Sequence, residues 1–291
     1  MSFDHRTQHP LQGVLFFVLA ILLISVVDTV CKIYTRDLHS IQLVWGYFVG
    51  INLTLWAFFI GKGEKFSNLK STNRPILQVI RPAFLVCSIS SLFVGLTYLP
   101  IAEATAIGFI APLFITALSV PILKEKVGLH RWGAVAIGLM GVIVIVRPGG
   151  SFWHWASIMP ILGALFFAMF QITTRLLSET ERTYTTLFYT GLGGLFWSSL
   201  IVPLVWVSPS TTHWCVFLAT GVMGAMAHLC MISAFNRAEA SLLAPYNYSK
   251  LIWVAILGYL IFGDIPSLDM WIGAIIIVAA GFYVLYQEKK T

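Results

Sequence analysis

Long apolar stretches recur along the whole chain, and short polar connections separate them. Segments such as 14–27 and 132–146 are apolar on all sides, whereas a membrane β-barrel strand alternates apolar and polar residues over about ten positions. A helix needs about 20 apolar residues to cross a hydrocarbon core about 30 Å thick. The pattern predicts an all-α, polytopic membrane protein with ten transmembrane helices. Their expected ranges are 12–34, 40–60, 76–98, 102–123, 132–147, 155–177, 184–206, 213–235, 239–262 and 270–286.

The composition excludes the soluble classes of protein. Of the 291 residues, 58% are hydrophobic and only 10% are charged, whereas an ordinary soluble domain has about 25% charged residues. Aromatic residues make up 14% of the chain, and the mean hydropathy is +0.86, so disorder is excluded as well. The chain is expected to lie in a lipid bilayer.

The loop charges predict the orientation. With the N-terminus inside, the inner segments hold twelve Lys and Arg residues, whereas the outer segments hold only Arg36 and Arg147. Positive residues are enriched in cytoplasmic loops, so we expect a multi-pass protein of the cell inner membrane with both termini in the cytoplasm. The net charge of +6 is explained by this topology, because the basic residues are scattered and do not form a nucleic-acid-binding patch.

The chain contains an internal repeat. Ala-Glu-Ala occurs at 102–104 and again at 238–240, and Trp132 in the first half matches Trp271 in the second. The halves are expected at 1–147 and 148–291, with five spans each. Because five is odd, the second half must be inserted upside down, an arrangement typical of secondary transporters.

These motifs resemble the EamA-type members of the drug/metabolite transporter superfamily. The resemblance rests on the small-Glu-Ala motifs at Glu103 and Glu239 and on the acidic residues Glu125 and Asp264 that follow the same spans. It implies ten helices in two inverted five-helix repeats. The first half is similar to members associated with S-adenosylmethionine, riboflavin or amino-acid-like metabolites. From their positions, Glu125 and Asp264 are expected to cap the next helices.

Charged residues within the spans are the candidates for function, because a charge in hydrocarbon is costly and needs a partner or a wet cavity. Lys250 is expected near the midplane, with Tyr246, Asn247 and Trp253 nearby on the same helix. With Asp28, which lies in the first span, these residues form the predicted substrate-binding set. The alternative for Lys250 is a structural pairing with a carbonyl group. Pro112 and Pro245 lie in corresponding spans, which marks these two helices as candidate cavity liners.

Further charged residues are expected near the two faces of the membrane. We expect Lys32 to pair with Glu103 on the outer side and Arg175 to pair with Glu239 on the inner side. A local pair between Asp28 and Lys32, which are four residues apart on one helix, competes with the outer pair. The candidates for gating or charge pairing are Lys32, Glu103, Arg175, Glu239 and Gln171, the last because Gln171-x-x-x-Arg175 repeats the spacing of Asp28-x-x-x-Lys32.

His228 is the candidate proton carrier, since it lies well inside a span and imidazole titrates near neutral pH. A hydrogen-bonded structural role is the alternative. The sequence has no phosphate-binding loop, catalytic triad or metal-ligand cluster, so no enzyme activity, cofactor or metal is expected.

The sequence therefore predicts a secondary-active transporter that moves a small organic metabolite, amino-acid-like or nucleoside- or vitamin-like, by alternating access. The expected partners are this substrate and the lipid bilayer, with coupling to protons or to exchange, in a monomer or homodimer. The alternatives are a cationic drug exporter and a non-transporting subunit of a membrane complex.

Overall fold

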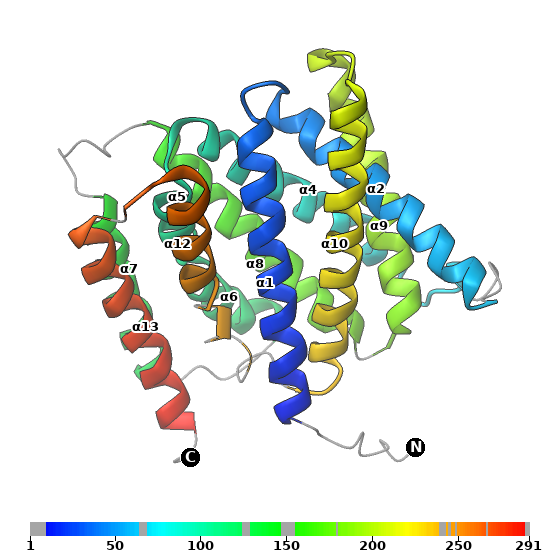
Figure 1. Cartoon of the computed structure of the whole chain (residues 1–291). Coiled ribbons are helices and arrows are strands. Elements are labelled where there is room, and N and C mark those ends of the chain that lie inside the picture. The colour runs from blue at the N-terminus through cyan, green and yellow to red at the C-terminus, as the bar shows by residue number, and fades with distance from the viewer. Residues whose placement is uncertain are drawn as a thin grey trace, which may run out of the picture.

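The computed structural model describes residues 10–63, 69–123, 129–146, 155–178, 180–238, 243, 246–247, 249–265 and 267–288, and every regular element in them is helical. The α-helices are α1 (Pro10–Tyr34), α2 (Ser40–Gly61), α4 (Pro75–Tyr98), α5 (Ile101–Gly108), α6 (Ala111–Leu123), α7 (Leu129–Val146), α8 (Ile158–Ser178), α9 (Thr183–Ile201), α10 (Thr211–Phe235), α12 (Ser249–Phe262) and α13 (Leu268–Glu288). Short 3₁₀ helices precede α8 at Trp155–Ser157 and follow α9 at Val202–Val205. Figure 1 shows that the start of α1 and the end of α13 lie at the same end of the bundle.

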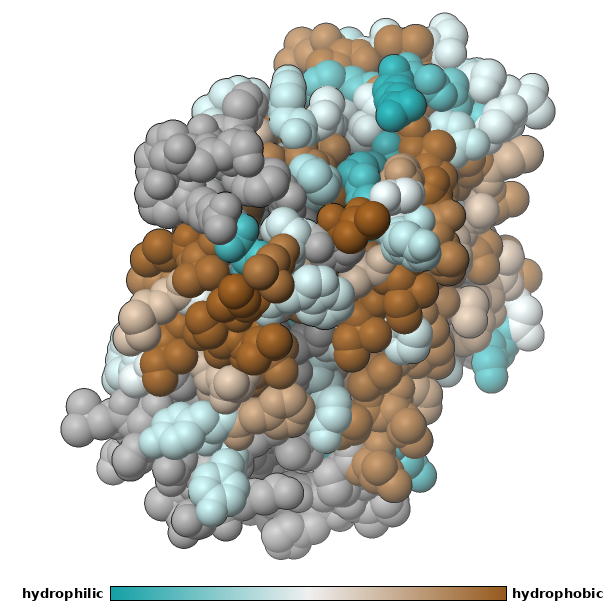
Figure 2. Space-filling model, turned by 60° about the vertical axis from the view of Figure 1, so that its left-hand side comes forward, coloured by the Kyte–Doolittle hydropathy of each residue, from teal (hydrophilic) through white to brown (hydrophobic). Residues whose placement is uncertain are grey.

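Seven segments within the described residues are long and apolar enough to cross a membrane. Two further helices, at Ser249–Phe262 and Leu268–Ala280, are apolar but shorter. The prediction of helical membrane segments is therefore confirmed, while the count of ten crossings stays a prediction. Large apolar side chains are exposed on the outside of the bundle, as lipid contact requires, and brown apolar patches cover much of the face in Figure 2.

The fourth predicted span is not one helix. Within the expected span 102–123 the chain turns at Phe109 and Ile110, between α5 and α6, while Ala104–Leu123 as a whole is still long and apolar enough to cross a membrane. Pro112 explains the break: it has no N–H to donate to the carbonyl of Gly108, whereas a proline is tolerated in the first turn of a new helix, where it stands in α6.

The ninth predicted span, 239–262, is described as a helix only from Ser249 onward. Glu239 and Pro245 lie outside the described residues. The helix ends at Phe262, and Gly263 follows with a φ of +70°, a left-handed conformation that glycine adopts without strain after a helix.

The packing of the helices is reciprocal between the two halves. Helix α1 packs on α10 and α8 packs on α4, while α2 packs on α10 and α9 packs on α4. Helix α12 lies against α1, and α6 lies against α8. Two further pairs, α2 with α9 and α7 with α13, join helices that occupy equivalent places in the two halves. In Figure 1, α7 and α13 lie side by side at one edge of the bundle. Each of these contacts therefore has a counterpart when the halves are exchanged.

The helices α2 and α10 cross at glycine residues, where their backbones come close together. A Cβ atom at Gly50 would overlap the carbonyl oxygen of Phe217, and one at Gly221 would overlap the backbone of Gly50. Small residues let helices approach in this way, and van der Waals packing then stabilises the pair in lipid. These helices form one wall behind the pocket described below.

Candidate substrate-binding pocket

A pocket opens between helices of both halves, and most of its lining is apolar. It encloses about 1160 Å³ of empty space, counting its open mouth. Helices α1, α2, α4, α8 and α10 line it together with the broken helix α5–α6 and the start of α12. The two spans that contain Pro112 and Pro245 thus both contribute to the lining, through residues such as Thr105 and Lys250. Apolar pockets with a few converging polar groups are typical of small-molecule sites.

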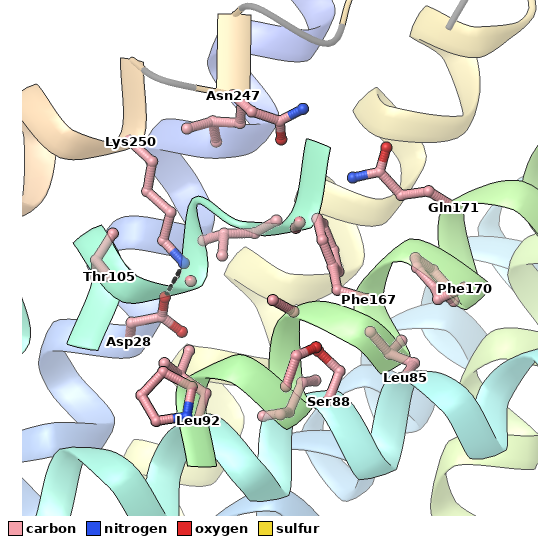
Figure 3. A pocket seen from close by; sticks show the side chains of 18 of the residues that line it. Asp28, Leu85, Ser88, Leu92, Thr105, Phe167, Phe170, Gln171, Asn247 and Lys250 are labelled. Carbon is pink, nitrogen blue, oxygen red and sulfur yellow. Dashed lines mark hydrogen bonds and ion pairs between the residues drawn. The ribbon is translucent and has the colours of Figure 1, made fainter. Parts of the chain in front are cut away.

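An ion pair lies inside this pocket. The Nζ atom of Lys250 is 2.6 Å from a carboxylate oxygen of Asp28, as the dashed line in Figure 3 shows. The Asp28 side chain is only 7% exposed and the Lys250 side chain 21% exposed. The pair joins α1 to the second residue of α12, which are far apart in the sequence. Both residues were in the predicted substrate-binding set, and the structure brings them together.

Of the other three predicted substrate-binding residues, one lines the pocket and two do not. Asn247 lines the pocket one turn before Lys250. Tyr246 and Trp253 are not among the lining residues; both are partly buried against the hydrophobic core. The reason is the local backbone: Tyr246 and Asn247 lie in a short 3₁₀ turn before α12, so the regular helical face expected from 246 to 253 does not extend through them.

Gln171 lines the pocket from α8, opposite the ion pair (Figure 3). The residue is 6% exposed, and its Nε2 atom is buried without a hydrogen-bond partner among the described residues. The sequence placed Gln171 among the gating or charge-pair candidates, whereas the structure shows it at the pocket.

His228 also lines the pocket, from α10, and is 4% exposed. Its Nε2 atom is 3.0 Å from the hydroxyl of Tyr47 on α2. The imidazole lies edge-on to the ring of Phe170, with centroids 6.2 Å apart. His228 is therefore hydrogen-bonded within the structure and also borders the cavity, so both roles considered for it remain compatible with its position.

Lys32, one of the outer charge-pair candidates, contacts a residue that the sequence did not pair with it. Lys32 lies 3.7 Å from Asp264, which follows α12, and its Nζ also lies 3.4 Å from the carbonyl oxygen of Leu99. The ammonium group sits over the ring of Phe262, 4.9 Å from its centroid. The Lys32–Asp264 contact was not predicted, since Asp264 was expected to cap α13. Ser267 takes that role, because its hydroxyl accepts a hydrogen bond from the N–H of Met270.

The predicted acidic partners of Lys32 and Arg175, Glu103 and Glu239, are not fully covered by the described residues. The side chain of Glu103 is not described, although its backbone belongs to α5, and the whole of Glu239 is outside the described residues. Arg175 lies in the last turn of α8 and is partly buried. The Lys32–Glu103 and Arg175–Glu239 pairs therefore stay predictions. Glu125 is also outside the described residues.

Two aromatic residues on α8 were missed by the sequence reasoning. Phe167 and Phe170 both line the pocket, and their rings lie nearly parallel, with centroids 6.2 Å apart. The sequence spacing does indicate Phe167, because it stands four residues before Gln171 and shares its helix face. In a chain with 21 Phe residues, that signal is hard to separate from ordinary core packing.

Arg81 on α4 lies directly behind this aromatic wall. It is fully buried, and its guanidinium group stacks on the Phe170 ring at 4.8 Å. The guanidinium donates hydrogen bonds to the hydroxyls of Thr174 and Thr190 and to the carbonyl oxygen of Thr186. No carboxylate in the described part of the chain pairs with Arg81, so a buried positive charge lies behind the pocket. Intramembrane charges of this kind normally face a partner or a cavity.

A bundle of apolar helices around a pocket with a buried ion pair defines a membrane transport protein. The EamA-like transporter family matches the chain twice, over residues 11–147 and 154–286. The chain belongs to this family, as its sequence motifs predicted.

Several characterised relatives are similar over almost their whole length. The S-adenosylmethionine uptake transporter of Rickettsia prowazekii (strain Madrid E) is 30% identical, over 97% of this chain and 95% of the relative. The riboflavin transporter of Vibrio cholerae is 28% identical, over 100% and 98%. The pseudopaline exporter of Pseudomonas aeruginosa is 25% identical, over 96% and 97%. One solved crystal structure shares the fold, with a TM-score of 0.71 over 94% of this chain and 98% of that chain at 19% identity.

Proposed function

We propose that the chain is a secondary-active carrier that moves a small organic metabolite across the cytoplasmic membrane by alternating access. The observation that carries the proposal is the Asp28–Lys250 ion pair in a mainly apolar pocket between the two halves. A structural ion pair would be expected away from a cavity. Here both partners face empty space that a ligand can fill.

We infer that the ligand has an amino-acid-like end. A zwitterion can insert between the two side chains, with its carboxylate on Lys250 and its ammonium group on Asp28, so that every buried charge keeps a partner. The N-terminus of α12, which starts at Ser249, adds a favourable dipole for the carboxylate. The positive charge of Arg81 behind Phe170, which has no carboxylate partner among the described residues, also favours a ligand that carries a carboxylate.

The relatives supply the first ligands to test. S-adenosylmethionine carries an amino-acid end joined to an adenosyl group, whereas riboflavin has a planar ring and no such end. We propose S-adenosylmethionine as the first candidate substrate, because the ion pair matches its amino-acid end.

The test is counterflow with the purified chain in liposomes loaded with unlabelled ligand. We expect labelled S-adenosylmethionine to accumulate transiently in loaded vesicles and not in vesicles without protein. A chain that moves neither S-adenosylmethionine nor riboflavin nor any zwitterionic amino acid in this assay would contradict the proposal, and a subunit of a larger complex would behave in that way.

The proposed topology has ten crossings and both termini in the cytoplasm. It is supported by the twelve inner and two outer basic residues, and by the position of the start of α1 and the end of α13 at one end of the bundle. The test is labelling of single introduced cysteines from outside intact cells, in a chain without its own four Cys residues. A cysteine in the 35–39 connection should react, and one in the 61–63 segment should not.

We propose that coupling, if the carrier uses protons, runs through His228, which borders the pocket and bonds to Tyr47. Liposomes with an imposed pH gradient test this. His228→Gln keeps a hydrogen-bonding side chain but cannot titrate, so uptake should lose its response to the gradient while counterflow at equal pH persists. If uptake by the variant follows the gradient as before, His228 has a structural role only.

A further inference from the structure

The Gln171 amide has hydrogen-bonding capacity that the described part of the chain does not use. Its Nε2 atom is buried without a partner among the described residues, although the side chain borders the pocket. An unsatisfied buried amide donor is destabilising, so proteins seldom retain one without a ligand or water to meet it. Figure 3 shows the amide turned into the space beneath Asn247.

The surface beside this amide is aromatic and flat. Phe167 and Phe170 precede Gln171 on α8, with their rings 25° from parallel. Phe170 is held from behind by the Arg81 guanidinium at 4.8 Å, so its position is fixed. Flat aromatic faces favour offset stacking with another planar ring. The pocket therefore has two distinct regions: the ion pair on one side, and an amide beside an aromatic wall on the other.

A primary amide offers a donor and an acceptor side by side. This arrangement matches the edge of a planar nitrogen heterocycle that carries an amino group next to a ring nitrogen, the pairing that Gln and Asn make with adenine. We infer that Gln171 binds the edge of such a ring in the substrate, while the ring packs against Phe167 and Phe170. The inference deepens the proposed function and rests on it, since it concerns the same pocket.

A second buried glutamine provides a matched control. Gln78 on α4 is fully buried, its Nε2 lies 3.5 Å from the Thr186 hydroxyl, and its Oε1 has no partner in the described structure. It does not line the pocket. Gln78→Met therefore removes the same buried chemical group as Gln171→Met, but away from the ligand.

The experiment combines these variants with paired ligands. Binding of S-adenosylmethionine is compared with that of its inosyl analogue, in which a carbonyl oxygen replaces the ring amino group, so that this oxygen and N7 present two acceptors and no donor to the amide. Wild-type protein should prefer the adenosyl form by about 5- to 150-fold, the range for a bidentate amide–base pair. Gln171→Met should lose most of that preference, and Gln78→Met should keep it. Thermal unfolding in detergent checks that each variant is folded.

The outcomes separate the two proposals. If wild type and Gln171→Met discriminate the two ligands equally, the heterocycle site is wrong while the carrier function stands. If wild type binds S-adenosylmethionine without preferring it over the inosyl form, the site is also overturned. If wild type binds neither ligand and also fails in counterflow, the proposed function itself fails. If Gln171→Met does not fold, Gln171→Ala provides the same test, because it removes the amide donor and acceptor without adding volume.

Discussion

Helices α1 and α8 occupy equivalent places in the two halves, yet they present different chemistry to the pocket. Asp28 on α1 and Gln171 on α8 stand at the same place in a repeated four-residue spacing, and both line the cavity. Asp28 forms a 2.6 Å ion pair with Lys250, whereas Gln171 leaves its buried amide nitrogen without a partner in the described structure. One duplicated position has become ionic and the other neutral.

This difference shows how a repeated fold can build an asymmetric site. The helix packing is reciprocal between the halves, so the backbone supplies similar positions twice. The side chains then divide the cavity into a charged region and a neutral one. A substrate with one zwitterionic end and one planar polar end would be held in a single orientation.

The largest effect is expected from removing the cation of the charged region. Lys250→Met leaves the 7%-exposed carboxylate of Asp28 without its partner, and breaking a buried pair costs about 3–5 kcal/mol. We expect a clear drop in thermal unfolding temperature and loss of counterflow. The double variant Asp28→Asn/Lys250→Met is neutral and should recover most of the stability but none of the transport of a zwitterion.

The double variant is the control for this prediction. If it transports as the wild type does, the ion pair stabilises the fold and does not bind substrate. The two halves would then differ in structure only.

The second largest effect is expected on the stability of the helices that follow α1 and α8, which are α2 and α9. Gly50 and Gly193 each stand 22 residues after Asp28 and Gln171. A Cβ at Gly50 would overlap the backbone of α10 at Phe217, whereas one at Gly193 would lie 2.6 Å from the ring of Pro82 on α4. A backbone cannot move aside without shifting a helix. Gly50→Ala should therefore destabilise more than Gly193→Ala, with overpacking costs of about 1–3 kcal/mol or more.

Gly133→Ala on α7 is the matched control, since nothing lies within 4 Å of its added Cβ. Its unfolding temperature in detergent should stay at the wild-type value or rise slightly. Equal loss at Gly50 and Gly193 would show that the two crossings are as alike as the repeat suggests.

The smallest effect on stability is expected at Lys32, the residue that follows Asp28 by four. Its contact with Asp264 is 3.7 Å long and partly exposed, and such pairs contribute about 0–1 kcal/mol. Lys32→Met should leave the unfolding temperature nearly unchanged. Because the contact joins α1 to the connection between α12 and α13, we expect the transport rate to change. An unchanged rate would show that this contact does not restrain the helices during transport.

Most of the fold could be predicted because it depends on the length of apolar segments. The first helix was expected at 12–34 and lies at Pro10–Tyr34. The break between α5 and α6 lies just before Pro112, which the sequence had marked as part of a candidate cavity-lining helix, but apolar content alone does not give the ends of the two short helices. The family followed from motifs that are local in sequence, such as the repeated Ala-Glu-Ala.

The site was harder to predict, because its contacts join distant residues. The sequence named Asp28 and Lys250 but offered Lys32 as the nearer partner of Asp28. Helical spacing favours such local pairs, and only the packing of α12 against α1 brings Lys250 to the carboxylate. The sequence placed Gln171 with the charged residues for the same reason. Its four-residue spacing from Arg175 can be read from the sequence, whereas its position at the pocket cannot.

The pairing of α7 with α13 bears on the ancestry of the chain. These helices occupy equivalent places in the two halves, as do α2 and α9, and the helices of each pair are in direct contact. In a symmetric dimer of identical subunits, the helices nearest the twofold axis touch their own copies. Before duplication and fusion, an ancestral protein of half the length would have used these same surfaces to associate with itself, and the present chain retains that dimer interface as part of its own interior.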